Sequence, residues 1–154
     1  MIHLTLPYPV SANKYWRTYM PKGFKAPVTT LSTEAKEYKK AVARICKAAG
    51  ICSPILGRVS VSYKLFPARP QDWQKRAKKD PLTWDDDVRC IDLDNANKVL
   101  MDSLKGIVFE DDKWVREIIA VRAEPDEEPA RLEITIKQLS LPAAPQKSLF
   151  EAAA

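Results

Sequence analysis

The chain has 154 residues, of which 45% are hydrophobic and 29% charged, and its formal net charge is +5. This length and composition are typical of one globular domain and exclude a fibrous repeat or a disordered chain. There is no run of the roughly 18 apolar residues that a membrane span needs and no signal-peptide pattern, so we expect a cytoplasmic protein without a membrane partner.

The charges are unevenly distributed. Residues 1–90 contain 17 Lys and Arg against 7 Asp and Glu, whereas residues 91–154 contain 8 against 13. A surplus of cations favours a polyanionic partner, because phosphates that bind cations release counterions. A nucleic-acid partner is one interpretation, and an ordinary solvated basic surface is the other.

The N-terminal half alternates strand and helix patterns. Alternating apolar residues predict strands at residues 2–6 and 59–65. Between them, residues 13–30 mix aromatic and basic side chains around a Pro-Lys-Gly turn, which indicates an irregular hairpin. Helical spacing then predicts a helix over residues 33–49, with a hydroxyl cap and a glycine stop.

The C-terminal half opens with a stretch that lacks periodicity. Residues 68–89 contain prolines, tryptophans and both signs of charge, which indicates a long loop. An apolar stripe follows and predicts a helix that begins with a cap at Asp94 or Asn95 and ends at Gly106.

Two further strands are expected, at residues 114–123 and 132–136. The interleaving of strands and helices predicts an α+β fold in one domain over residues 1–140, with a small mixed sheet packed against two main helices. Residues 141–154 lack a packing pattern and are expected to form a loose tail.

Six acidic side chains gather between Cys90 and Lys113 in this basic protein. Asp92 and Asp94 are two residues apart, so in an extended chain their carboxylates leave the same side and can share a ligand. Lys98 lies one helical turn beyond Asp94.

Asp111 and Asp112 follow the helix, at the entrance to the next strand. If the chain turns back after the helix, Asp112 returns beside Asp92 and Asp94 in the same protomer. Three such carboxylates repel one another unless a cation is present. Hard oxygen donors favour Mg²⁺, or Mn²⁺ in its place, and such an ion beside a basic surface suits phosphodiester hydrolysis.

A purely structural interpretation stays open at this point. Asp94 or Asn95 can simply cap the helix, and Asp111 with Asp112 can simply form a turn. The Asp94–Lys98 pair can be a solvated contact that contributes a few tenths of a kcal/mol.

The segment IDLDNANKVLMDSLKGIVFEDDKWV resembles the signature of the RusA family of Holliday-junction resolvases. That signature has D-L-D-N, a Lys four residues after the second Asp, a D-x-L helix end and a later D-D. The segment LTLPYPVSANKYWR is similar to the family's opening strand and turn, and LSTEAKEYKKAVARI to its first helix. The resemblance covers most of residues 2–137.

The resemblance implies that Asp92, Asp94 and Asp112 are catalytic carboxylates that bind Mg²⁺, with Asp111 assisting, and that Lys98 is the essential lysine. It also implies a homodimer that cuts four-way DNA junctions by paired hydrolysis and leaves 5′-phosphate ends. Such an enzyme serves DNA recombination and repair in a bacterial or phage-infected cell.

Two regions are candidates for DNA contact. One is the aromatic and basic hairpin, with Lys14, Trp16 and Arg17, whose aromatic side chains can instead belong to a dimer contact or to the core. The other is the long loop, with Lys75, Arg76, Lys78, Lys79 and Arg89. The RusA prototype has a run of arginines directly before D-L-D, where this chain has Arg89-Cys90-Ile91, so junction binding is expected to depend on the loop. Trp73 or Trp84 either stacks on an unpaired base or packs within the loop.

Two alternatives remain. Asp111-Asp112-Lys113 matches the D-x-K half of a PD-(D/E)xK nuclease site, in which Lys113 rather than Lys98 is essential. The other alternative is a non-catalytic protein that binds branched DNA as an accessory factor and whose acids only cap and turn.

Overall fold

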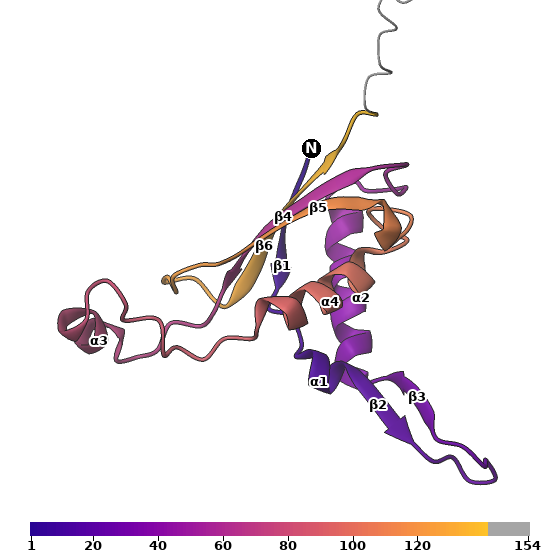
Figure 1. Ribbon diagram of the computed structural model, residues 1–154, viewed down its shortest axis with the longest axis horizontal. Coiled ribbons are helices and arrows are strands. Elements are labelled where there is room, and N and C mark those ends of the chain that lie inside the picture. Colours follow the sequence, from indigo (N-terminus) through magenta and orange to yellow (C-terminus); the bar gives the residue numbers. More distant parts are fainter. Residues whose placement is uncertain (142–154) are drawn as a thin grey trace, which may run out of the picture.

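The computed structural model describes residues 1–141, and its body is a four-stranded mixed sheet (Figure 1). The strands lie in the order β1-β6-β4-β5. Their bounds are Ile2–Pro7 for β1, Val59–Phe66 for β4, Val115–Arg122 for β5 and Arg131–Gln138 for β6. β4 and β5 are parallel, whereas β6 is antiparallel to both β1 and β4. The predicted α+β class and mixed sheet are therefore confirmed.

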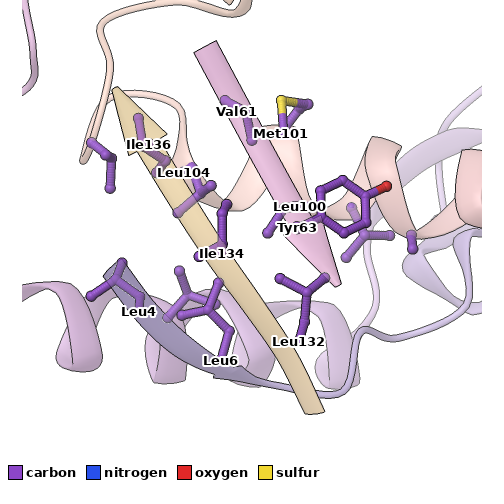
Figure 2. Close-up of a cluster of buried hydrophobic side chains, with 14 of the residues drawn as sticks. Leu4, Leu6, Val61, Tyr63, Leu100, Met101, Leu104, Leu132, Ile134 and Ile136 are labelled. Carbon is purple, nitrogen blue, oxygen red and sulfur yellow. The ribbon is translucent and has the colours of Figure 1, made fainter. Parts of the chain in front are cut away.

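The alternation of the strands separates the two faces of the sheet. One row across the sheet joins Leu6, Leu132 and Leu65, and all three side chains are buried. Figure 2 shows this apolar face meeting residues such as Leu100 and Leu104 from the helix behind it. The preceding row, which joins Thr5, Glu133 and Lys64, turns polar side chains to the opposite face. Burial of each large aliphatic side chain in this core stabilises the fold by about 1.5–3 kcal/mol.

Two helices cover the apolar face. Helix α2 (Thr33–Ala48) begins after Ser32, whose hydroxyl accepts a hydrogen bond from the Ala35 N–H at 3.1 Å. Helix α4 (Leu93–Leu104) buries the predicted stripe and is followed by Gly106, whose φ of +76° suits glycine. Both main helices were predicted within a few residues of their bounds.

Two segments project from this body in different directions (Figure 1). One is the predicted hairpin, formed by β2 (Trp16–Tyr19) and β3 (Val28–Leu31) after the short helix α1 (Ala12–Tyr15). The other is helix α3 (Trp73–Lys79), which lies within residues 68–89.

The prediction that residues 68–89 form a loop without helices is wrong. Helix α3 buries none of its residues, so it has no apolar stripe for a periodicity argument to detect. Its Gln, Lys, Arg and Ala residues are good helix formers in themselves.

The predicted tail at 141–154 lies outside the described residues, apart from Leu141. No helix among residues 1–141 combines the length and the apolar character that crossing a membrane requires.

Candidate active site at the two ends of α4

The N-terminal end of α4 presents two exposed carboxylates. Asp92 is the N-cap residue, with extended backbone (φ −64°, ψ 143°), but its side chain makes no capping hydrogen bond. Asp94 lies in the first turn, and its carboxylate is 3.9 Å from the Lys98 ammonium, with both side chains largely exposed. This pair is loose, so both groups are free to meet a ligand.

Two tyrosines hold the backbone around these acids. The Ile91 N–H donates to the Tyr8 hydroxyl at 2.7 Å, and the Tyr63 hydroxyl donates to the Leu93 carbonyl at 3.2 Å. Burial raises the pKa of Tyr8 to about 12, so the phenol stays neutral. Burial, with the nearby Asp94 charge, also raises the pKa of Tyr63. The backbone at this end is therefore fixed by neutral groups while the carboxylates remain in solvent.

A cleft of about 440 Å³ opens beside Asp92. Arg89 and Asn95 line it from the same segment, and Ser11 and Asn13 line it from the root of the hairpin. The cleft thus holds an acid, a cation and neutral hydrogen-bonding groups together. Ser11, Asn13 and Asn95 were not predicted as site residues. For Asn95 a signal was present, because a residue three positions after Asp92 lies on the same side of a helix.

The C-terminal end of α4 has acids of a different kind. The Lys105 ammonium lies 3.0 Å from Asp111 and 3.5 Å from Asp112, which begins a 3₁₀ turn, Asp112–Trp114. Asp111 also accepts the Lys113 backbone N–H at 3.0 Å. That hydrogen bond, followed by the contact with Lys105, lowers the pKa of Asp111 from 3.8 to about 2.

The two acidic groups lie at opposite ends of the helix. Twelve helical residues span about 18 Å. β5 starts beside the C-terminal end and ends near the N-terminal end, where the Arg122 guanidinium donates to the Val88 carbonyl at 2.8 Å. Among residues 1–141 no three His, Cys, Asp or Glu side chains gather as a metal site.

The prediction that Asp112 meets Asp92 and Asp94 within one protomer is therefore wrong. A strand that runs back along a helix starts at the helix's C-terminal end and reaches the other end only after its full length. Asp112 precedes the first residue of β5, so it stays where the helix ended.

The model of the RusA endodeoxyribonuclease family matches residues 7–137. The chain belongs to the RusA family. A similar protein is the crossover junction endodeoxyribonuclease RusA of Enterobacteria phage 82, which is 32% identical over 98 residues. That match covers 58% of this chain and 77% of the phage protein. The resemblance expected from the D-L-D-N segment is thereby confirmed, and membership supports a nuclease activity.

The donor chemistry at the N-terminal end fits the ion expected for a RusA protein. Mg²⁺ in phosphate-handling sites is usually bound by one or two carboxylates, with substrate phosphates and water completing the shell. Asp92 and Asp94 supply two exposed carboxylates at this end, and Asp92 also lines the cleft, which has room for a phosphate group. No imidazole lines this cleft, and its one thiol, that of Cys90, donates to the Ile91 carbonyl at 3.4 Å and accepts from the Tyr8 hydroxyl at 3.6 Å.

The residues predicted for DNA contact divide among three places in this RusA fold. Arg89 lines the cleft with Asp92. Lys14, Trp16 and Arg17 are exposed at the root of the hairpin. The remaining four, on helix α3, are Lys75, Arg76, Lys78 and Lys79, of which Arg76 pairs with Asp72 at 2.9 Å.

The two tryptophans of residues 68–89 pack against each other and toward the connection between β5 and β6. Trp84 is buried, and its indole N–H donates to Glu124 at 2.7 Å. Trp73 lies against Trp84, with ring centroids 6.1 Å apart, and the Arg69 guanidinium stacks over Trp73 at 4.4 Å. Packing is therefore the interpretation that the structure favours for Trp84.

Proposed function

We propose that the protein is a Mg²⁺-dependent, structure-selective endodeoxyribonuclease that resolves four-way DNA junctions by paired hydrolysis, as part of DNA recombination and repair. The observation that carries this proposal is the cleft at the N-terminal end of α4, where exposed Asp92 and Arg89 lie together. The two projecting basic segments supply cationic surface for the arms of the junction. We place this activity in the cytoplasm of a bacterial or phage-infected cell.

In this proposal Asp92 and Asp94 hold Mg²⁺, which supplies Lewis-acid stabilisation of the reacting phosphate when it is bound. Arg89 binds a phosphate oxygen at the mouth of the cleft. Lys98, one turn along the helix, places its ammonium against the charge that develops on the phosphate. Asn13 and Asn95 orient the substrate through neutral hydrogen bonds.

We further propose that a homodimer completes the site. β5 is an edge strand, and Ile118, Ile119 and Val121 are exposed on it. An unpaired apolar edge readily pairs with a second copy of itself. In an antiparallel pair about a two-fold axis, the start of one β5 lies beside the end of the other. Asp112 of the partner subunit then approaches Asp92 and Asp94. Within a single chain, Asp112 cannot reach these two acids.

A mixture of two inactive variants tests this shared site. In a heterodimer of Asp92→Asn and Asp112→Asn chains, one site carries both substitutions and the other carries neither. Mixing therefore restores about a quarter of the wild-type sites, seen as single nicks instead of paired cuts. If each site is built within one chain, the mixture stays as inactive as each variant alone.

The whole proposal is tested with purified protein and a synthetic four-way junction, with Mg²⁺, with Mn²⁺ and with EDTA. Paired symmetric cuts with 5′-phosphate ends are expected with either ion, together with binding but no cutting in EDTA. Binding without cutting under every condition contradicts the proposal and supports the non-catalytic alternative. Cutting of linear duplex at the same rate as the junction contradicts the proposed structure selectivity.

A further inference from the structure

The tip of the hairpin is apolar although it stands in solvent. The strand pairs end at Tyr19 and Val28, so residues 20–27 form the tip. Met20 is 58% exposed and Phe24 64% exposed. Nothing in residues 1–141 covers these two side chains, whereas most other large apolar residues pack in the core.

The tip is held in a defined shape. The Phe24 N–H donates to the Pro21 carbonyl at 3.1 Å and closes a tight turn, in which Gly23 has a φ of +88°. Only glycine adopts such a φ without strain, so the turn that presents Phe24 depends on it. Beneath the tip, the hydroxyls of Thr18 and Thr29 join the two strands at 2.9 Å.

The root of the hairpin is fixed to the helix that carries the site. Tyr15 is buried, and its hydroxyl donates to Asp102 of α4. Lys39 of α2 contacts the same carboxylate at 3.1 Å. These contacts place the tip at a set position relative to α4, so contact between the tip and DNA also positions the strand that enters the cleft.

The charge of this segment favours a polyanionic partner. Residues 1–33 contain no Asp or Glu. Lys14 lies in α1 at the root, and the hairpin itself carries Arg17, Lys22 and Lys25. Lys22 and Lys25 flank the exposed Phe24 on either side along the chain. An apolar tip surrounded only by cations suits a ligand with phosphates outside and flat apolar faces inside. Nucleic acid has both, in its backbone and its bases.

We propose that the hairpin tip is a wedge, in which Phe24, with Met20 beside it, stacks on bases at the branch point of the junction while Lys22 and Lys25 hold the adjacent phosphates. This inference rests on the proposed function, since it assigns the part that recognises the branch. Intact duplex resists such insertion because its bases are stacked on both sides, and unstacking costs least where pairing is already interrupted. The wedge therefore favours branched over linear DNA.

The test uses a four-way junction with 2-aminopurine at the branch point, in EDTA so that no strand is cut. Wild-type protein is expected to raise the 2-aminopurine fluorescence, and Phe24→Ala to lose most of that rise. Phe24→Ala is also expected to weaken junction binding roughly 5- to 100-fold while leaving duplex binding unchanged. Leu56→Ala is the matched control, because Leu56 is equally exposed, at 65%, but lies in the loop before β4.

Three results overturn the wedge. The first is unchanged fluorescence and affinity in both Phe24→Ala and the double variant with Met20→Ala. The second is an equal loss of duplex and junction binding. The third is a loss of dimer mass, which assigns the tip to a subunit contact. Failure of the proposed function looks different, since wild-type protein then opens the branch point but cuts nothing in Mg²⁺. Normal cutting with no effect of Phe24→Ala rejects the wedge alone.

Discussion

The two ends of α4 carry the same kind of side chain in different states. At the C-terminal end, Lys105 and a backbone N–H already compensate Asp111. At the N-terminal end, Asp92 makes no capping bond, and Asp94 has only a loose contact with Lys98. An acid with partners in the folded chain contributes to structure, whereas an exposed acid beside a cleft is available for a cation.

Asp111 and Asp112 also differ from each other in their contacts and exposure. Asp111 accepts the Lys113 N–H and has the shorter contact with Lys105, whereas Asp112 is 61% exposed and its contact is 3.5 Å. Asp112 is therefore the better candidate to reach a partner subunit, and Asp111 the better candidate to hold the turn. Variants at the two ends of α4 test this division.

The largest effect is expected for Asp92→Asn and Asp94→Asn. Each is expected to lower the single-turnover rate of junction cleavage at least about a hundredfold, because the proposed Mg²⁺ site loses one of its two carboxylates. Junction binding in a gel-shift assay is expected to hold or tighten, since a negative charge that faces phosphate is removed. A joint loss of binding and thermal stability would instead make these acids structural.

The two lysines distinguish the ends of the helix. Lys98→Ala is expected to slow cleavage about 10- to 100-fold, because the proposed site loses the ammonium that it places against the developing charge. Lys113→Ala is the matched variant, and its cleavage rate is expected to stay at the wild-type level, since the Lys113 side chain lies over Trp114 with its ammonium 5.5 Å from the ring centroid. The reverse ranking would support the PD-(D/E)xK scheme at the C-terminal end.

A charge on the edge strand tests whether two copies join the ends. Ile119→Lys places a cation on β5, where Ile119 is 60% exposed, and is expected to weaken dimerisation about tenfold or more. Analytical ultracentrifugation reports the change in mass, and cleavage is expected to recover as protein concentration rises. Thr5→Lys on β1, at the opposite edge of the sheet, is the control and is expected to remain dimeric.

The sequence was sufficient for those elements whose side chains alternate between core and solvent. β4 was predicted because Val61 and Leu65 belong to an apolar series of period two, and β6 because Ile134 belongs to another. α4 was predicted because Val99 and Leu104 lie on one helical stripe. Helix α3 was missed because nothing in it is buried, and α1 because its four residues are too few to show a period.

The sequence predicts which residues belong to the site, but it does not predict how they are arranged in space. The D-L-D-N segment pointed to Asp92 and Asp94 through its resemblance to the family signature. The spacing argument assumed an extended chain, whereas Asp94 lies in the first turn of α4. The position of Asp112 depends on where β5 starts, which the pairing of β5 with β4 decides and local spacing does not. The cleft, likewise, brings Asn13 from before the hairpin to Asn95 on α4, a contact between segments far apart in the chain.

The smallest effect concerns the titration of Asp111. Its pKa is lowered, so its contribution to stability is present above pH 3.8 and is lost as the pH falls through about 2. Because the Lys113 N–H is the larger cause and Lys105 the next, Lys105→Ala is expected to raise this pKa only part of the way toward 3.8. NMR titration of the Asp111 carboxyl measures the midpoint, and Lys98→Ala, at the other end of α4, is the control that leaves it in place. An unchanged midpoint in Lys105→Ala means that Lys105 does not compensate this acid, and the contrast between the two ends of the helix then rests on the backbone alone.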